Sequence, residues 1–399
     1  MTVIIRKYIF YFKLIIKYLF IKYKKSSIVS NYQDYDLSND YFIKNFSVEV
    51  IMESAYANCR LPKSYPMCNG GAALMWHQPA YVLEIPDAVQ VHNSDVVRHG
   101  SLAYLAKTEN PNSFKEIFTD SDLVSRKNGA LVLSNPSGVV EVDKGISLLG
   151  VGSSHWAHFL VDYMPRLHIL RGHFSSVDTI LLPSNADENI RDLVSFFTND
   201  QVSLTYVEPQ ACVRANKLYT CSPIAYLCNH ANFQSISDIV IPDKTREIIK
   251  NQMLDLSSAF WDSKKTTNRK VFIGFEGQRR PSNYYIIRDL LEANGYCTIY
   301  PHKLSLREKV NLFSSVEKVI GVGSSGFTNL LLCHNHVDAI ALMNPERSLA
   351  NYVSQFQPEY PSMNYELYVG ENVGSFDINS EYLINIDKFS KFLSHRGFI

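Results

Sequence analysis

The sequence predicts an α/β fold with parallel, doubly wound sheets and β-rich additions in the N-terminal half. Its 399 residues are enough for two domains that each bury a core. The content of 46% hydrophobic and 20% charged residues is ordinary for a globular protein. From about residue 155, apolar runs of strand length alternate with amphipathic runs of helix length. This alternation is typical of a parallel sheet covered by helices.

The C-terminal half shows the alternation most clearly. Strands are expected at 270–275, 297–301, 318–323 and 337–343, and helices at 282–296, 304–315 and 326–333. Gly295 is placed to end the first helix, because glycine adopts the left-handed conformation after a helix without strain. Ser305 and Glu308, three residues apart, form a capping-box pair at the start of the second. Ligands of such sheets bind at the carboxyl ends of the strands.

The N-terminal half divides into two patterns. Short strand-like runs separated by turns occupy 49–150 and predict a mostly β region. A helix is then expected over 155–170, with Pro165 kinking or ending it. Further elements follow as strand, helix, strand and a helix linking the two halves, at 177–183, 187–197, 203–208 and 241–254.

Charge is distributed unevenly, although the net charge is zero. Residues 1–25 contain seven basic residues and no acidic one, leaving 32 basic against 39 acidic residues elsewhere, a net of −7. This balance makes nucleic acid an improbable partner. The seven cysteines form no C-x-x-C pair, which indicates reduced thiols and a cytoplasmic protein.

Residues 1–25 are predicted to be a basic amphipathic segment. The apolar run 3–21 is interrupted by four cations, among them Arg6, Lys13 and Lys17, which share one face of a helix. Such a helix fits an interfacial position on an anionic membrane surface. A helix packed on the protein's own surface is the alternative. The prediction is therefore a cytoplasmic protein held peripherally at the inner face of the membrane.

Three segments combine residue types that could perform chemistry. The first is Gly321–Asn329, which follows a strand and opens a helix. Glycines allow close backbone approach to a phosphate, and the helix start offers free N–H groups. Hydroxyl donors come from Ser324, Ser325 and Thr328. A tight turn without any ligand is the alternative.

The second segment contains Arg279 and Arg280, followed by Asn283. It too lies between an expected strand and an expected helix. Because a guanidinium contacts two phosphate oxygens at once, these residues could bind the same anion as the glycine segment. Two solvated surface arginines are the alternative.

The third segment is the start of the helix 155–170. On a regular helix His155, His158 and Asp162 share one face, and His158 and Asp162 are close enough to touch. A polar stripe among apolar residues is costly to bury unpaired, so it predicts a function. General-base chemistry by the imidazole is one, a hydrogen-bonded structural cluster is another, and a metal site with three ligands is a third.

Together these segments resemble the family 61 glycosyltransferases. Members typically show His-Trp/Phe-x-x-Asp/Glu-x-x-Pro-Arg-Leu, then an arginine before an asparagine, then Ser-Leu-x-Glu-x-Val, and last Gly-Leu-Thr-Asn-Leu-Leu. The matching stretches occur here in the same order, at 158–167, 280–283, 305–310 and 326–331. The chain departs from the family pattern at Phe275, at Gly323–Ser325 and near Ala341, where many members have an acidic residue and Glu346 is the nearest candidate.

The resemblance implies a GT-B-like fold, in which two Rossmann-like domains face a cleft. It implies an inverting transfer from a nucleotide-sugar donor to a glycan acceptor in surface or capsular polysaccharide synthesis, with no metal cofactor. Predicted catalytic residues are His158 as base and Asp162 as its partner or as the base itself. Donor contacts are expected from Arg280, Asn283, Gly323, Ser324, Ser325, Gly326, Thr328 and Asn329, and acceptor or cleft contacts from His155 and Arg166.

The expected organisation follows from these assignments. A linker at 26–48 precedes an acceptor-side domain at 49–240, a nucleotide-sugar domain at 241–375, and a tail at 376–399 that packs back. A non-catalytic relative that binds a glycan or a nucleotide is the alternative function, because the departures from the family pattern lie in the glycine segment and near it.

Overall fold

The computed structural model describes residues 26–29, 31–32, 47–52, 55–61, 63–65, 71–77, 80–92, 94–95, 97–99, 102–104, 124–127, 130–198, 202–227, 239–262, 269–277, 280–345, 363–373 and 381–399. The predicted membrane-associating segment 1–25 lies outside them. None of the helices within these ranges has both the length and the apolar character needed to cross a membrane.

The C-terminal half is built on a six-stranded sheet in which every neighbouring pair is parallel. Its order is β19 (Cys297–Ile299), β18 (Lys270–Ile273), β20 (Lys318–Val322), β21 (Val337–Met343), β22 (Met363–Val369) and β5 (Lys63–Tyr65). The chain runs from β18 outward to β19, returns to β20 on the other side of β18, and continues to β22. The strand order therefore reverses between β18 and β20, which we call the C-terminal switch point.

The connections of this sheet follow the sequence signals. They are α7 (Tyr284–Ala293), the 3₁₀ turn η5 (Pro301–Lys303), α8 (Leu306–Phe313) and the 3₁₀ helix η6 (Ser325–Leu332). Gly295 has a φ of +82° just after α7, and the Ser305–Glu308 capping box at α8 is formed, as predicted. The helix expected at 326–333 is the 3₁₀ helix η6.

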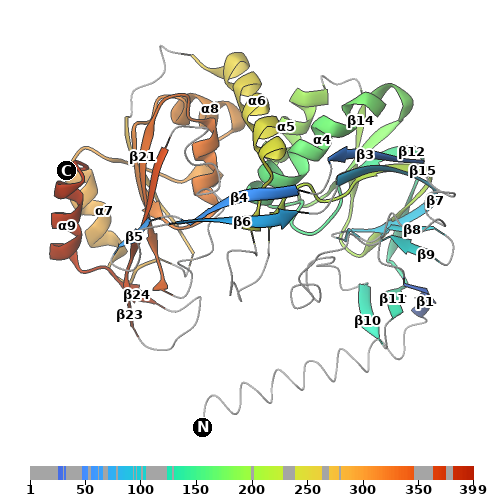
Figure 1. Cartoon of the computed structure of the whole chain (residues 1–399), viewed down its shortest axis with the longest axis horizontal. Helices are drawn as coiled ribbons and strands as arrows, with labels where there is room; N and C mark the ends of the chain where they lie inside the picture. Colours follow the sequence, from blue (N-terminus) through green and yellow to red (C-terminus); the bar gives the residue numbers. More distant parts are fainter. Residues whose placement is uncertain are drawn as a thin grey trace, which may run out of the picture.

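The last segment of the chain packs on the same sheet. It contains β24 (Tyr382–Leu383), which pairs with β23 (Glu371–Asn372), and α9 (Ile386–His395). Phe389 and Phe392 of α9 are buried in one cluster with Phe272 of β18 and Ile287 of α7. Figure 1 shows α7 and α9 side by side at the outer edge of this half.

The N-terminal half contains a nine-stranded mixed sheet. Its order is β14 (Ser203–Val207), β13 (Thr179–Pro183), β12 (Gly138–Ser147), β15 (Ala211–Cys221), β7 (Ala80–Val91), β8 (Val97–His99), β9 (Leu102–Tyr104) and β2 (Asn31–Tyr32), with β3 (Ser47–Met52) also paired to β7. The first four strands are mutually parallel. They run from β12 outward to β14, and β15 lies on the other side of β12. The order reverses between β12 and β15, the N-terminal switch point.

Helices cover one face of this sheet. On the other face, side chains from its own strands pack together in a buried cluster. The chain leaves β12 through α3 (Trp156–His158), the π-helix η1 (Phe159–Tyr163), α4 (Met164–Leu170) and the 3₁₀ segment η2 (Arg171–Ser176), and α5 (Glu188–Thr198) joins β13 to β14. On the opposite face, Ala88 of β7 and Val213 of β15 are buried in one cluster with Leu181 and Val207. The long strands thus curl over their own sheet.

A β-segment links the two halves. After β3, the strands β4 (Ala55–Leu61) and β6 (Gly71–His77) pair antiparallel, and between them β5 joins the C-terminal sheet beside β22. Figure 1 shows β4 and β6 running from one sheet to the other. The β-rich additions expected in the N-terminal half therefore also supply a strand to the C-terminal sheet.

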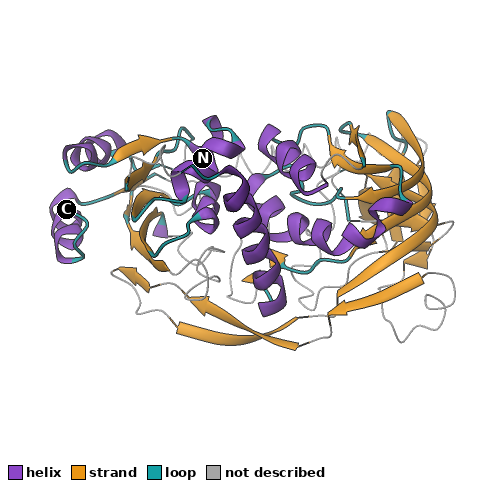
Figure 2. Ribbon diagram, turned by 90° about the horizontal axis from the view of Figure 1, so that it is seen from above, coloured by secondary structure: helices purple, strands orange, loops and turns teal. Residues whose placement is uncertain are grey.

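Helices occupy the space between the two sheets, as Figure 2 shows. The linking helix predicted from the sequence is α6 (Asp243–Phe260), which contacts both α4 and α8. One buried cluster includes Ile146 and Ile180 of the N-terminal sheet together with Val271 and Val319 of the C-terminal sheet. The halves therefore share a continuous core.

Several elements were not expected. The predicted linker 26–48 includes β1 (Ser26–Val29), which pairs with β11 (Ala130–Ser134), and also β2. The eleven-residue β15 was not predicted, because Arg214, Asn216 and Lys217 interrupt its apolar residues and leave no continuous apolar run. Smaller elements are β10 (Val124–Lys127), β16 (Tyr226–Leu227) and β17 (Ile239–Val240).

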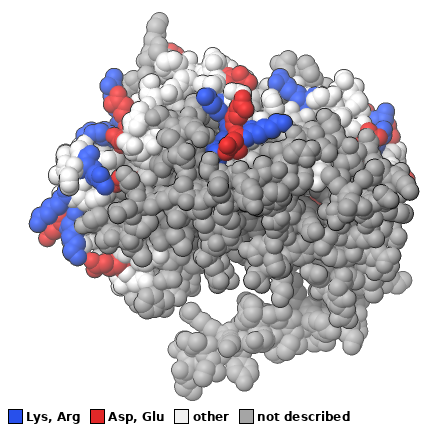
Figure 3. All heavy atoms as spheres, viewed as in Figure 1, with Lys and Arg blue, Asp and Glu red and all other residues white. Residues whose placement is uncertain are grey.

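The described surface carries mixed charge. Figure 3 shows basic and acidic side chains next to one another on the described part of the face it presents. Examples of such pairs are Arg288 with Asp289 and Lys303 with Glu276. Because opposite charges neutralise one another over short distances, this part of the surface has no broad field of one sign.

Candidate active site

The two segments predicted to bind phosphate both follow strands that border the C-terminal switch point. The loop after β18 leads to Arg280 and Asn283, and the loop after β20 is the glycine segment Gly321–Asn329. Both leave the carboxyl ends of neighbouring parallel strands. In open parallel sheets this position is where ligands bind.

Close packing also favours glycine at positions in this segment. A Cβ at Gly321 would lie 2.6 Å from the Cβ of Ile273 on the neighbouring strand, and one at Gly323 would overlap the sulfur of Met343. Gly321 therefore requires glycine for strand packing alone, because its Cβ would also lie 2.8 Å from the carbonyl oxygen of Ile273, whereas at Gly323 the Met343 side chain would have to move. Gly326 is less constrained, because its Cβ would meet Ile273 at 3.0 Å.

The start of the glycine segment is accessible and its end is buried. Gly323, Ser324 and Gly326 are half-buried and Ser325 is exposed, so a ligand can reach this part of the segment. The N–H of Gly323 already donates to the carbonyl of Leu342 at 2.9 Å, and that of Gly326 to the hydroxyl of Ser324 at 3.3 Å. Thr328 and Asn329 are buried, and their side chains donate hydrogen bonds back to the carbonyls of Ser325 (2.6 Å) and Gly326 (2.8 Å). The two buried residues therefore support the segment, whereas only the first part can contact a donor directly.

Arg280 lies half-buried beside the aromatic start of α7. Its guanidinium is 5.4 Å from the ring centroid of Tyr284 and 5.2 Å from that of Tyr285, and it donates to the Tyr285 hydroxyl at 3.5 Å. Within the described part of the chain it has no carboxylate partner. A cation held by rings and lacking a counter-ion can still bind an anion. Arg279 lies outside the described residues.

The side chain of Asn283 bonds to the backbone of Ile384. Its amide nitrogen donates to the carbonyl of Ile384 at 2.7 Å, and its amide oxygen accepts from the N–H of the same residue at 3.3 Å. This pair of bonds attaches the start of α7 to the segment after β24. Each polar atom of Asn283 thus makes one bond within the fold, and its predicted contact with the sugar donor stays a prediction.

The helix that follows β12 is interrupted by the π-helical turn η1. Pro165 is the second residue of α4 and has no N–H to donate to the carbonyl four residues earlier. A wider turn before it relieves the clash that an α-helical carbonyl would have with the proline ring.

The first turn of this helix touches the glycine segment. The indole N–H of Trp156 donates to the side-chain oxygen of Asn329 at 3.0 Å, a contact across 173 residues. His155 beside it is exposed, and its ring centroid lies 6.4 Å from that of half-buried His158. The ring of His158 packs against Gly152, where a Cβ would be 3.0 Å from it and where φ is +76°.

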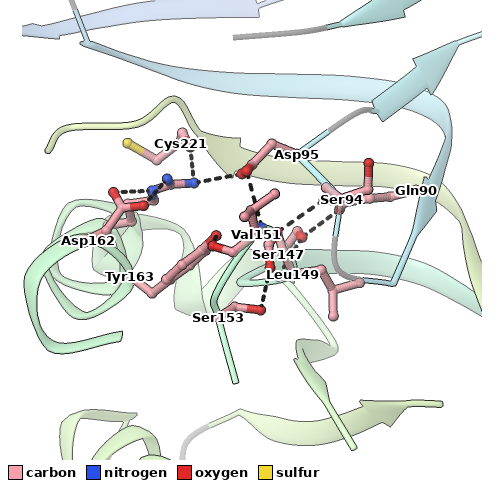
Figure 4. Close-up of polar contacts among 12 residues, drawn as sticks. Gln90, Ser94, Asp95, Ser147, Leu149, Val151, Ser153, Asp162, Tyr163 and Cys221 are labelled. Carbon is pink, nitrogen blue, oxygen red and sulfur yellow. Dashed lines mark hydrogen bonds and ion pairs between the residues drawn. The ribbon is translucent and has the colours of Figure 1, made fainter. Parts of the chain in front are cut away.

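The N-terminal switch point is filled by an ion-pair network, drawn in Figure 4. Arg166 donates from Nε to Asp162 at 2.9 Å and from Nη2 to the other oxygen of the same carboxylate. Its Nη1 reaches Asp95 at 3.3 Å and the carbonyl of Cys221, at the end of β15, at 3.4 Å. Asp95 also accepts from the N–H of Val151, in the loop after β12, at 3.2 Å.

Burial dominates the electrostatics of this network. It raises the pKa of Asp95 to about 6, against the opposing effect of Arg166. It also raises the pKa of Asp162, although Arg166 and the N–H groups of Ile224 and Ala225 favour the charged carboxylate. The pKa of Arg166 is raised well above its ordinary value by Asp162 and other neighbours, despite burial. One guanidinium thus neutralises one of two buried carboxylates.

The network changes two sequence-based interpretations. The sequence suggested His158 as the partner of Asp162, whereas both oxygens of Asp162 accept from Arg166, which lies four residues later. Arg166 is 4% exposed, so its expected contact with an acceptor in the cleft is not supported. Asp95 was not identified at all, because it precedes its partner Arg166 by 71 residues and carries no local motif.

Lys309 is a second residue that the motifs did not single out. It lies in α8 between Glu308 and Val310, is 1% exposed, and holds its Nζ 4.1 Å from the ring centroid of Trp156. A sequence signal was present, because a lysine occupied a position that the helix periodicity of α8 directs toward the core.

One comparison with known proteins identifies a family. The model of the glycosyltransferase 61 family matches residues 156–340, from the start of α3 into β21. The match therefore includes Trp156, Arg280, Lys309 and the glycine segment, and it excludes Asp95. No curated protein matches the chain.

Proposed function

Because residues 156–340 form a glycosyltransferase family 61 domain, we propose that this protein transfers a sugar from a nucleotide-sugar donor to a glycan acceptor, with inversion at the anomeric carbon. The proposed pathway is surface or capsular polysaccharide synthesis. No metal is required by this mechanism, since cationic and backbone donors can neutralise the leaving diphosphate.

The observation that carries the proposal is the contact between Trp156 and Asn329. Trp156 follows the carboxyl edge of β12 and Asn329 follows that of β20, so segments at the carboxyl edges of both sheets touch. A ligand bound at the glycine segment would therefore lie close to the helix that bears His155 and His158. We interpret this as a GT-B-like arrangement, with the donor on the C-terminal half and the acceptor on the N-terminal half.

The donor diphosphate is proposed to lie on the first part of the glycine segment. The N–H groups of Ser324 and Ser325 and the hydroxyl of Ser325 are its proposed hydrogen-bond donors, and Arg280 supplies positive charge. Charge on the diphosphate increases as the bond to the sugar breaks. Donors arranged before the reaction stabilise that charge without reorganisation.

The proposed base is His158. Asp162 is a weaker candidate for the base than His158, because both of its oxygens accept from Arg166. In the proposed step the acceptor oxygen bonds to the anomeric carbon while its proton passes to the imidazole of His158. The bond from that carbon to the diphosphate oxygen breaks, and its electron pair leaves with the diphosphate.

Membrane association is proposed from the sequence of residues 1–25. Seven cations beside aromatic and aliphatic side chains are suited to an anionic surface. Full-length protein should sediment with vesicles containing phosphatidylserine, and protein lacking residues 1–25 should not. Equal sedimentation of the two would exclude this role for the segment.

The catalytic proposal is tested with a panel of nucleotide sugars. At least one should raise the melting temperature of the full-length protein and release its nucleoside diphosphate when glycan acceptors are added. His158→Ala should then lower turnover by roughly 10²–10⁴-fold with little change in donor affinity, whereas His395→Ala, at an exposed position of α9, should not.

The same panel separates the alternatives. Near-normal turnover of His158→Gln, which keeps a hydrogen bond but cannot accept a proton, would reject His158 as the base. Binding of a donor without turnover on any acceptor would favour the non-catalytic glycan- or nucleotide-binding relative. Absence of any donor binding would reject the proposed function.

A further inference from the structure

Lys309 occupies a position between the two halves of the protein. It belongs to α8 of the C-terminal half, and its Nζ lies over the indole ring of Trp156 from the N-terminal half. A charged neighbour of Lys309 is Asp187, which precedes α5 of the N-terminal half. The side chain therefore extends out of its own helix toward the helices of the other half.

The charge of Lys309 is buried without a close counter-ion. Its side chain is 1% exposed, and within the described residues Nζ has no hydrogen-bond or ion-pair partner. Burial lowers its pKa to about 8, with a smaller opposing effect of Asp187. The amine thus remains mostly protonated at neutral pH, and the indole ring is the group that faces its charge.

A chain of contacts leads from this cation to the glycine segment. The face of Trp156 meets Lys309, and its edge N–H donates to Asn329. Asn329 is 0% exposed and donates in turn to the carbonyl of Gly326 at 2.8 Å. An indole that rotated away from Lys309 would lose the bond to Asn329, because one rigid ring makes both contacts.

We propose that Lys309 is a positioning residue for donor binding, which holds the Trp156 ring against Asn329 and thereby fixes the glycine segment in its binding conformation. This inference rests on the proposed function. It concerns how the donor site is ordered by the other half of the protein, and not which atoms touch the donor. We name the three side chains Lys309, Trp156 and Asn329 the interdomain latch.

Measuring both the melting temperature and the nucleotide affinity of a Lys309 variant separates a positioning role from a merely structural one. An unpaired buried charge costs stability, and an apolar residue of similar length removes that cost. Lys309→Met should therefore leave the melting temperature unchanged or raise it. If the latch orders the donor site, the same substitution should nevertheless weaken nucleotide binding, because part of the binding energy must then order the segment.

The experiment titrates UDP, GDP, CDP, ADP and dTDP into full-length protein by calorimetry and continues with the tightest binder. Lys309→Met should raise the Kd about tenfold, a size typical of one lost ordering contact, without lowering the melting temperature. Trp156→Phe, which keeps a ring but loses the N–H, should raise it as well. Lys391→Met, the same substitution at an exposed position of α9, is the control and should leave the Kd unchanged.

A second readout does not depend on a nucleotide. With tryptophan indoles labelled by ¹⁵N, the Trp156 signal should shift and its N–H should exchange faster in Lys309→Met and in Asn329→Ala. An unchanged Trp156 signal in Lys309→Met would overturn the latch. So would a Kd within twofold of wild type, or a lowered melting temperature that accompanies the weaker binding. Failure of every nucleotide to bind wild type would instead reject the proposed function, and the indole signal would still decide the latch.

Discussion

The two switch points of this protein share a topology but not a chemistry. In each half a central parallel strand has neighbours reached in opposite directions, at β12 and β15 in one sheet and at β18 and β20 in the other. At the N-terminal point, the charged groups of Asp95, Asp162 and Arg166 bond to one another and to backbone. At the C-terminal point, glycine backbone is accessible and Arg280 has no described carboxylate partner.

The difference indicates that a switch point, the kind of position at which many sheets bind ligands, can instead hold ion pairs that stabilise the fold. A site closed by its own ion pairs offers no unsatisfied group to a substrate, whereas one with free donors does. Substitutions at the N-terminal switch point should therefore cost stability, and those at the C-terminal one should cost ligand binding.

The largest effect is expected from Arg166→Ala. Removal of the guanidinium leaves two buried carboxylates without their cation, which typically costs about 3–5 kcal/mol. The free energy of unfolding in urea should fall by this amount. Arg269→Ala is the control, because its ion pair with Glu317 is exposed and worth about 1 kcal/mol or less. Equal losses in the two variants would contradict the assignment of Arg166 to the fold.

The next effect is a pH dependence of stability caused by Asp95. Its folded-state pKa is raised to about 6 from an ordinary value of 3.8. Between these values the folded state binds a proton that the unfolded state does not, so stability falls as pH rises from about 4 to 6 and then levels off. The full change is at most roughly 3 kcal/mol, since one pKa unit corresponds to about 1.4 kcal/mol.

Asp95→Asn tests this dependence, because the amide does not titrate. Unfolding free energies of the variant and of wild type, measured at several pH values between 4 and 7, should differ in slope below pH 6 and run parallel above it. Parallel curves throughout this interval would show that Asp95 does not bind the proton.

The ease of prediction also differs between the two switch points. The sequence patterns that mark the C-terminal switch point are local, so they could be recognised. The glycine segment, Arg280 and the Ser305–Glu308 capping box each lie within a few residues of a strand or helix boundary. Such signals depend on backbone geometry that neighbouring residues determine.

The N-terminal switch point could not be foreseen in the same way. Asp95 meets Arg166 only because β7 and β15 pair, and the sequence carries no local trace of that pairing. On the helix after β12, His158 and Arg166 each lie four residues from Asp162, so spacing alone could not tell which of them pairs with it. No local signal assigned β5 to the C-terminal sheet either, because it joins β22 across 303 residues.

At the C-terminal switch point, Arg280→Ala should weaken nucleoside diphosphate binding. A charge-assisted hydrogen bond contributes about 1.5–3 kcal/mol, so the Kd should rise by roughly tenfold or more while the melting temperature stays the same. Arg288→Ala is a matched control, because Arg288 also lies over the Tyr285 ring but pairs with Asp289. A Kd that changes only in the Arg288 variant would reject the role of Arg280.

The smallest effect is expected from Ser325→Ala. Its exposed hydroxyl is a neutral donor to the diphosphate in our proposal, and such a bond contributes about 0.5–1.5 kcal/mol. Calorimetry should show a Kd between about twofold and tenfold higher, with unchanged stability. A decrease in stability instead would assign Ser325 to the fold.

The central claim is that the C-terminal switch point binds the nucleotide and the N-terminal one does not. A crystal structure of the full-length protein with the nucleoside diphosphate that binds most tightly tests it most directly. We predict the diphosphate oxygens within hydrogen-bond distance of the N–H groups of Ser324 and Ser325 and of the guanidinium of Arg280, with the Arg166 ion pairs intact. Diphosphate bound to Arg166, with its bonds to Asp95 and Asp162 broken, would contradict the account.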